Sequence, residues 1–200
     1  MGIIVSVLVA IAFKNTEMSH KEFYVGKNSV ILAFGDSLTF GYGAQKTESY
    51  PSYMEQKTGV RVINAGINGE LSATGLKRLP RLLKEYDPNV VILCHGGNDI
   101  LQKRSQDELK KNLLEMVALI KESGADVLLV GVPEFSSYSF GVLDIYEEIA
   151  RESSLVLEDS VLTKIELDRR LKSDYVHPNA KGYALMAETF IDTLGIKRLE

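Results

Sequence analysis

The chain has 200 residues, of which 45% are hydrophobic and 25% charged, and its formal net charge is −4. This length and composition are those of an ordinary globular protein with one domain and a sizeable core. The acidic balance and the lack of any Lys/Arg-rich run argue against a nucleic-acid-binding protein. The single cysteine, Cys94, excludes an intrachain disulfide and a multi-cysteine metal site.

The first 13 residues, MGIIVSVLVAIAF, are apolar almost throughout. They are too few to cross a bilayer as a helix, which takes roughly 20 residues. Ile3–Val9 has the length of a short signal-peptide core and the following Ala-Ile-Ala has the form of a cleavage site, although no Lys or Arg precedes the run. We expect export or membrane association through residues 1–13; the alternative is a buried first element of a cytoplasmic protein.

A polar, irregular segment follows over residues 14–28 and is expected to be a linker, which leaves residues 29–200 as the folded domain. Short apolar runs of β type then alternate with helical patterns. Because these runs are nearly continuous in apolar residues, they are typical of a parallel sheet covered on both faces. The runs are Val30–Phe34, Val60–Ala65, Val90–Cys94, Val127–Val132 and a short Leu155–Leu157.

Helical patterns fill the intervals between the apolar runs. A capping box at Ser105–Glu108 opens an apolar stripe that Gly124 is expected to end. Pro51 suits the first turn of a helix, whereas Pro80 is expected to kink or divide another. Asn179 is expected to cap a last helix. The alternation predicts an α/β fold, a three-layer α/β/α sandwich with right-handed crossovers.

Glycine-containing polar turns follow each of the first three predicted strands. They are Gly35-Asp36-Ser37, Gly66-Ile67-Asn68-Gly69 and Gly96-Gly97-Asn98-Asp99. In open parallel sheets, ligands bind outside the carboxyl ends of the strands. The three turns are therefore expected to converge on one edge of the sheet and to form a site.

A serine at such an edge needs a base within hydrogen-bond reach to act as a nucleophile. The chain has three histidines. His20 lies in the expected linker, and His95 closes an apolar strand, where packing is favoured over substrate contact. His177 follows Asp174 by three residues, so that Asp174 could orient its imidazole from the same loop. Taken alone, a serine after a strand is usually a turn residue or a helix cap.

Four segments in this order resemble the SGNH/GDSL hydrolase family. The segments are Gly35-Asp36-Ser37-Leu38-Thr39, Asn64–Gly69, Gly96–Asp99 and Asp174–Pro178. The resemblance runs from about Val30 to Leu194 and is closest to the bacterial arylesterases, acyl-CoA thioesterases and lysophospholipases. The stretch Gly75–Pro80 also looks like that branch. It implies an SGNH hydrolase fold with a flavodoxin-like parallel sheet of about five strands.

The resemblance implies a role for each polar residue of these segments. Ser37 would be the nucleophile, His177 its base and Asp174 the residue that orients His177. The backbone N–H groups of Ser37 and Gly69 and the side-chain amide of Asn98 would form the oxyanion hole. Gly66 is the competing glycine. Asp36 is expected to make only local hydrogen bonds, and Cys94 to be buried and inert.

The resemblance also implies that the substrate is a small-molecule ester or thioester, including a lysophospholipid. Tyr42, Phe135, Tyr138 and Phe140 are candidates to line an acyl groove, or else to anchor their loops. No cofactor or metal motif is present. The alternatives are a carbohydrate or peptidoglycan O-acetylesterase and a non-catalytic binding module. The acidic composition and the lack of repeats are compatible with a monomer.

Overall fold

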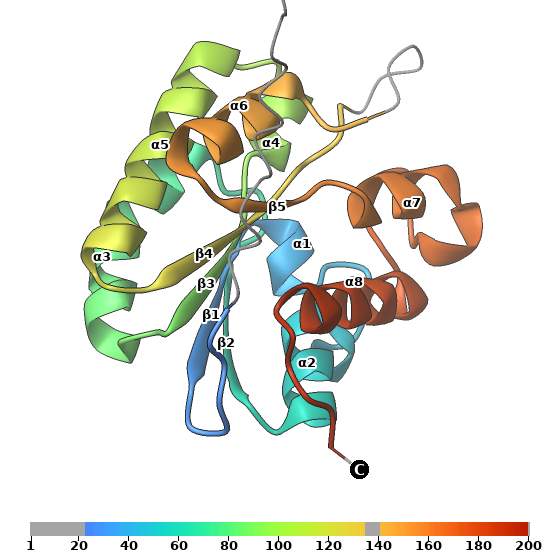
Figure 1. Ribbon diagram of the computed structural model, residues 1–200. Helices are drawn as coiled ribbons and strands as arrows, with labels where there is room; N and C mark the ends of the chain where they lie inside the picture. Colours follow the sequence, from blue (N-terminus) through green and yellow to red (C-terminus); the bar gives the residue numbers. More distant parts are fainter. Residues whose placement is uncertain (1–22, 135–140, 200) are drawn as a thin grey trace, which may run out of the picture.

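The computed structural model describes residues 23–134 and 141–199, which form a five-stranded parallel sheet in the order β2-β1-β3-β4-β5 (Figure 1). The strands are β1 (Val30–Gly35), β2 (Arg61–Gly66), β3 (Val90–Cys94), β4 (Asp126–Val130) and β5 (Val156–Glu158). The chain leaves β1 for β2 on one side and then crosses to β3 on the other. In sheets with this strand order, ligands bind where the chain changes the side on which it adds strands. Here that point lies beyond the carboxyl ends of β1 and β3.

Helices cover both faces of the sheet, which confirms the predicted three-layer sandwich (Figure 1). One outer layer holds α3, α5 and α6, and the other holds α2, α8 and α7. The helices are α1 (Ser37–Phe40), α2 (Tyr50–Thr58), α3 (Ser72–Tyr86), α4 (Gly97–Leu101), α5 (Gln106–Glu122), α6 (Asp144–Ser153), α7 (Val161–Leu167) and α8 (Ala180–Thr193), with 3-10 turns η1 (Lys46–Glu48) and η2 (Arg169–Leu171).

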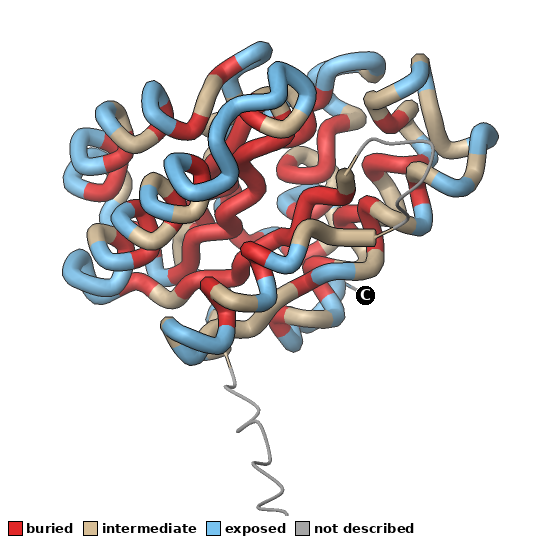
Figure 2. The backbone as a smooth tube through the Cα atoms, turned by 90° about the horizontal axis from the view of Figure 1, so that it is seen from above, coloured by how far each residue is buried: buried red, intermediate tan, exposed pale blue. Residues whose placement is uncertain are grey.

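The centre of the core is the pair of strands β1 and β3. Every residue of β3 and Ile31–Phe34 of β1 are fully buried, and these strands form part of the red centre of Figure 2. Strands covered by helices on both faces need apolar side chains in both directions, which explains the nearly continuous apolar runs. Burial of each large aliphatic side chain contributes about 1.5–3 kcal/mol.

Helix ends follow the capping signals in the sequence. The Oγ of Ser105 accepts the N–H of Glu108 at 3.3 Å, and Gly124, just beyond α5, has a φ of +89°. The Oδ1 of Asn179 accepts two N–H groups of the first turn of α8, and Pro51 lies in the first turn of α2. The predicted roles of Gly124, Asn179 and Pro51 and the Ser105 half of the predicted capping box are confirmed, because each rests on local backbone chemistry.

Pro80 was expected to kink or divide its helix, and the division is wrong. One helix, α3, runs from Ser72 to Tyr86 with Pro80 inside it. A proline removes one backbone donor and introduces one steric conflict. Leu79, Leu82 and Leu83 around it are buried in the core, and their packing outweighs that local cost.

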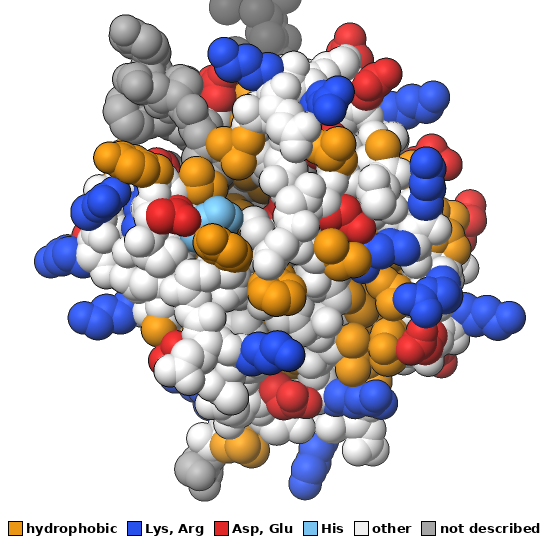
Figure 3. Space-filling view, turned by 180° about the vertical axis from the view of Figure 1, so that it is seen from behind, with side chains coloured by type: hydrophobic (Ala, Val, Ile, Leu, Met, Phe, Trp, Pro, Cys, Tyr) orange, Lys and Arg blue, Asp and Glu red, His pale blue; other side chains and the backbone are white. Residues whose placement is uncertain are grey.

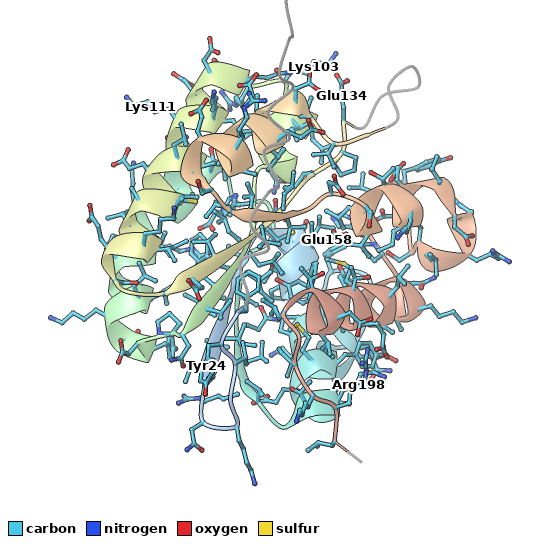
Figure 4. All side chains as sticks on the ribbon, in the orientation of Figure 1. Tyr24, Lys103, Lys111, Glu134, Glu158 and Arg198 are labelled. Carbon is cyan, nitrogen blue, oxygen red and sulfur yellow. The ribbon has the colours of Figure 1, made fainter. Side chains whose placement is uncertain are left out.

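Four helices went unpredicted: the short α1 and α4, in the turns after β1 and β3, and α6 and α7, neither of which begins with a side-chain cap of its own. The cap of α7 comes instead from Glu158, the last residue of β5 (Figure 4). Its buried carboxylate accepts the N–H and Oγ–H of Ser160 at 3.1 and 2.7 Å and the N–H of Val161 at 3.0 Å. The strand bounds also shift slightly: β4 ends at Val130 instead of Val132.

Candidate active site

The turns after β1, β2 and β3 lie at one edge of the sheet. Gly35, the last residue of β1, pairs with Gly66 of β2 on one side and with Cys94 of β3 on the other. The segments that follow these three residues therefore start side by side, as the sequence predicts. The segment before α8 reaches the same edge, since His177 contacts Ser37.

Ser37 is the first residue of α1, directly after β1. Asp36 caps this helix, because its Oδ1 accepts the N–H of Leu38 at 3.1 Å. Asp36 is buried, and this burial raises the pKa of its carboxyl above the usual value. A backbone hydrogen bond from Gly97, at the start of α4, acts in the opposite direction and lowers the pKa. Asp36 therefore also contacts the turn after β3, and the expectation that its hydrogen bonds are only local is wrong.

Two glycines allow α1 to lie against the strand ends. A Cβ added to Gly66 would stand 2.0 Å from the backbone nitrogen of Phe40, and one added to Gly35 would stand 2.0 Å from the carbonyl oxygen of Cys94. Gly66 therefore has a packing role beside α1. The position of the α1 backbone, and of Ser37 at its start, depends on this close approach of α1 to β2.

Ser37, His177 and Asp174 form a continuous hydrogen-bonded chain. The Oγ of Ser37 lies 3.1 Å from Nε2 of His177, and Nδ1 of His177 lies 2.8 Å from Oδ2 of Asp174. An ionised carboxylate only accepts hydrogen bonds, so the proton between the latter two belongs to Nδ1. Nε2 is then left as an acceptor that faces the Ser37 hydroxyl.

Asp174 is kept ionised by its surroundings. Partial burial raises the pKa of its carboxyl, but backbone N–H groups and His177 outweigh this effect and lower the pKa to about 2. Its Oδ1 accepts the N–H of Val176 at 2.7 Å and that of His177 at 2.8 Å. The same backbone bonds fix the direction in which the carboxylate faces the imidazole.

Gly69 and Asn98 follow β2 and β3 at this edge. Gly69 has a φ of +73°, which favours glycine, and no atom lies within 4 Å of the place where a Cβ would stand. Asn98 lies in the first turn of α4, and its Nδ2 donates to the carbonyl oxygen of Glu70 at 3.1 Å. A primary amide has two N–H donors, so this bond orients Asn98 and leaves a second donor on the same nitrogen.

Asn98 is also held through its neighbour Asp99. The Oδ2 of Asp99 accepts the N–H of Ser72 at 2.9 Å, and its Oδ1 accepts the Ser72 Oγ–H at 2.7 Å. Asn112 of α5 in turn donates to Ser72 Oγ at 2.9 Å. These buried bonds tie the short helix α4 to the starts of α3 and α5.

Exposed apolar side chains are frequent near the residues of this edge in sequence. Five of the eight large hydrophobic residues exposed in the described part of the chain lie within five residues of Ser37, Gly69, Asn98 or Asp174. They are Phe40, Tyr42, Ile67, Leu101 and Tyr175. On the face shown in Figure 3, a histidine lies among hydrophobic side chains beside a carboxylate.

The candidate substrate contacts divide into two groups. Tyr42 is half exposed, and its ring centroid lies 4.5 Å from that of His177. Phe135, Tyr138 and Phe140 lie outside the described residues, as do the leader over residues 1–13 and His20. Of the four candidate substrate contacts, Tyr42 is therefore the one that the described part of the structure places beside the His177 imidazole.

His95 is a packed residue, in agreement with the interpretation favoured from the sequence. Its side chain is fully buried, and its ring packs 5.8 Å from that of Phe34. Its Nε2 lies 3.2 Å from the carboxylate of Glu70, which also binds Arg78. Sequence reasoning gave no role to Glu70 or Arg78, because a charged residue beside a turn or on a helix is usually solvated. Cys94 is buried as well, as expected.

No group of three or more His, Cys, Asp or Glu side chains is placed to hold a metal ion in residues 23–134 and 141–199. Within the same ranges, no helix has the length and apolar character needed to cross a membrane.

Known proteins that are similar to this chain are hydrolases. The profile of the GDSL-like lipase/acylhydrolase family matches residues 33–185. An arylesterase of Vibrio mimicus is 33% identical over 171 residues, 79% of this chain and 84% of that protein. Thioesterase 1/protease 1/lysophospholipase L1 of Escherichia coli is 28% identical over 173 residues, 83% of each chain. The crystal structure of the esterase EstA from Pseudoalteromonas, inhibited by monoethylphosphonate, is 27% identical with a TM-score of 0.76, over 84% of this chain and 97% of that one.

Proposed function

This chain belongs to the GDSL-like lipase/acylhydrolase family and is an ester hydrolase, and from that premise we propose that it acts through an acyl-enzyme on Ser37. The observation that carries the proposal is the hydrogen-bonded chain from Ser37 through His177 to Asp174, with distances of 3.1 and 2.8 Å. It supplies a nucleophile, a base and an orienting carboxylate in hydrogen-bond contact.

In the first half of the reaction, Ser37 Oγ attacks the carbonyl carbon while its proton passes to Nε2 of His177. The resulting imidazolium is stabilised by the ionised Asp174. The tetrahedral intermediate then collapses, the bond to the leaving oxygen or sulfur breaks, and His177 gives the proton to that atom. An acyl group remains on Ser37 Oγ. Water, deprotonated by His177, releases the acid and restores the hydroxyl.

The negative charge of the tetrahedral intermediate falls on the former carbonyl oxygen. We assign its stabilisation to the N–H groups of Ser37 and Gly69 and to Nδ2 of Asn98. Donors already fixed in place need no reorganisation when the charge develops, and one of them can be worth about 3–4 kcal/mol. The hydrogen bond from Asn98 to Glu70, at 3.1 Å, supports such a fixed amide.

The surroundings of Ser37 support esters and thioesters with an apolar acyl or aryl group, lysophospholipids included. The exposed ring of Tyr42 beside His177 offers an apolar contact near the reacting atoms. A small depression is lined by Leu38, Val176 and Pro178, which are sequence neighbours of Ser37 and His177. Its other lining residues are Pro133, Leu162, Ile165 and the charged Glu166. Apolar linings with few polar groups favour acyl chains over sugars.

The test is hydrolysis of p-nitrophenyl acetate, butyrate, octanoate and palmitate, and of the matching acyl-CoA thioesters, by the full-length chain and Ser37→Ala. We expect the highest kcat/KM between butyrate and octanoate and no activity in Ser37→Ala. Activity on acetate alone would favour an O-acetylesterase. Activity that survives Ser37→Ala would refute the acyl-enzyme on this residue.

The depression has a test of its own. Ile165 is buried in its lining, whereas Leu167 on the same helix α7 is exposed. Ile165→Ala should shift the preference toward longer acyl chains, because it enlarges the apolar space, and Leu167→Ala should leave the chain-length profile unchanged. The same chain-length profile in both variants would show that the depression does not bind the acyl chain.

Export or membrane association through residues 1–13 is part of the same proposal, as is a monomeric state. The support is the apolar leader with its Ala-Ile-Ala segment and the composition of the chain. Mass spectrometry of the N-terminus of the protein isolated from a bacterial host tests cleavage. A mature chain that still begins at Met1 in the cytoplasmic fraction would contradict export, and sedimentation as a dimer would contradict the monomer.

A further inference from the structure

A buried polar cluster of Glu70, Arg78 and His95 lies behind the active-site edge of the sheet. Nε of Arg78 donates to both carboxylate oxygens of Glu70 at 2.8 and 2.9 Å, and one Nη of Arg78 lies 2.6 Å from Oε2. Nε2 of His95 lies 3.2 Å from the same Oε2. The side chains of Glu70 and His95 are 2% and 0% exposed and that of Arg78 is 17% exposed, so the cluster is largely shielded from solvent.

The hydrogen bonds define the protonation of the cluster. The N–H of Gly96 donates to Nδ1 of His95 at 3.0 Å, so Nδ1 is an acceptor and Nε2 carries the proton that His95 donates to Glu70. Burial would raise the pKa of Glu70, but the bonds from His95 and Arg78 outweigh it and lower the pKa. His95 is therefore a neutral donor to an ionised carboxylate.

The fold makes room for this arrangement. A Cβ added to Gly75 of α3 would stand 2.4 Å from Nε2 of His95. The guanidinium of Arg78 lies 4.2 Å from the centre of the Phe34 ring, which shields its other face. Buried charges of this kind are costly unless they are paired and fully hydrogen-bonded. Such a cluster is expected to have a use beyond packing.

Together, the three residues of the cluster connect the ends of β1, β2 and β3. An Nη of Arg78 donates to the carbonyl oxygens of Gly35 and Ala65, at the ends of β1 and β2, at 3.2 and 2.8 Å. His95 begins the turn that leads to α4. Glu70 directly follows Gly69, and its own carbonyl oxygen accepts the amide of Asn98.

We propose that Glu70, Arg78 and His95 form a positioning network that holds the oxyanion donors of Gly69 and Asn98 in register with Ser37. Gly69 has no side chain to hold its backbone and adopts a positive φ, so the direction of its N–H depends on the residues that flank it. The Glu70 side chain anchors the next residue to the strand ends, while the Glu70 carbonyl orients the Asn98 amide. The inference rests on the proposed function, because it concerns the oxyanion hole of that reaction.

The first test is the kcat and KM of Glu70→Gln on p-nitrophenyl butyrate. The NH₂ group of a glutamine would replace one carboxylate oxygen of Glu70, and it cannot accept the hydrogen bonds that Arg78 and His95 donate. We expect kcat to fall about tenfold to hundredfold with KM nearly unchanged, less than the loss expected for removal of an oxyanion donor itself. Thr58→Val is the matched control. It removes a buried hydroxyl that bonds to Met54 and Val60 at the start of β2, far from the active-site edge.

A double-mutant cycle separates positioning from general loosening of the fold. If Glu70 acts partly through Asn98, Glu70→Gln should cost less in the Asn98→Ala background, by about twofold or more, as for residues of one hydrogen-bond network. If Glu70→Gln acts only by loosening the fold, the fold-losses in kcat of the two single variants should multiply in the double variant.

His95 provides a second, independent pair of variants in case Glu70→Gln does not fold. His95→Gln keeps an N–H donor toward Glu70, and His95→Leu has none. We expect His95→Gln to retain most of the kcat that His95→Leu loses. Equal kcat in both variants, or independent effects in the cycle, would overturn the proposal.

The two proposals fail in different ways. If Ser37→Ala is as active as the wild type, the proposed function is refuted. Activity that depends on Ser37, together with Glu70→Gln and His95→Leu variants that lose stability but keep kcat as Thr58→Val does, would refute only the positioning network.

Discussion

Replacing Asp174 with asparagine removes a charge while keeping the size of the side chain. In the wild type, Oδ1 accepts two backbone N–H groups at 2.7 and 2.8 Å, and Oδ2 faces Nδ1 of His177 at 2.8 Å. The asparagine oxygen fits the two N–H groups, so its NH₂ would face Nδ1. Nδ1 would then become the acceptor and the proton would move to Nε2, which could no longer accept the proton of Ser37.

The expected loss is large because the variant stabilises the wrong tautomer. Where the aspartate of a serine protease triad is replaced in this way, kcat falls about 10,000-fold. The same loss here corresponds to roughly 5.4 kcal/mol of transition-state stabilisation. The assay is kcat on p-nitrophenyl butyrate between pH 5 and 9. Asp174→Ala is the comparison, since it leaves the tautomer of His177 free.

Two results would refute this reasoning. Asp174→Asn with kcat within about tenfold of the wild type would show that the carboxylate does not set the tautomer. Asp174→Asn clearly more active than Asp174→Ala would show that size and backbone contacts matter more than the proton on the ring.

The same substitution changes the response to acid. The pKa of Asp174 is about 2 in the folded protein against a usual 3.8, so the unfolded chain takes up the proton first as pH falls. The contribution of this group to stability is present above about pH 4 and is lost as pH falls toward 2. The side chain is 44% exposed, and after screening by solvent we expect no more than about 1 kcal/mol. The Tm difference between wild type and Asp174→Asn should narrow from pH 5 to pH 2.5; a constant difference would contradict this.

Three further substitutions test separate parts of the account. Asn98→Ala should lower kcat by about 100- to 1,000-fold with little change in KM, and a loss confined to KM would exclude an oxyanion role. Gly66→Ala would place a Cβ 2.0 Å from the nitrogen of Phe40; it should lower both the Tm and kcat because α1 must shift, and unchanged values of both would show that α1 can adapt. Ile92→Ala, in the fully buried β3, should lower the free energy of unfolding by about 2–5 kcal/mol in urea titrations, and a change below about 1 kcal/mol would contradict the assigned core.

The fold was largely predictable from local patterns. The apolar runs at Val30, Val60, Val90 and Val127 correspond to β1 to β4 within two residues at each end. Caps such as Ser105 and Asn179 depend on contacts within one turn, which the sequence carries directly. Pro80 shows the limit of local reasoning: the buried leucines around it keep α3 in one piece, and their packing partners lie far away in sequence.

The active site was predictable only in part. The resemblance of four ordered segments to the SGNH/GDSL family implied the roles of Ser37, His177 and Asp174, and the structure brings these side chains into hydrogen-bond contact. Glu70 and Arg78 were missed because their importance comes from burial and from carbonyl groups of other strands. The stretch Gly75–Pro80, which includes Arg78, was the one signal that pointed to this region.

The most direct test of the central claim is covalent trapping of the nucleophile. The full-length protein is incubated with an alkylphosphonate p-nitrophenyl ester, and its intact mass, residual activity and labelled peptide are measured. We predict one phosphonyl group per chain, on Ser37, with loss of activity in proportion to labelling and no label in Ser37→Ala. Labelling at another residue, or full activity with Ser37 modified, would contradict the account.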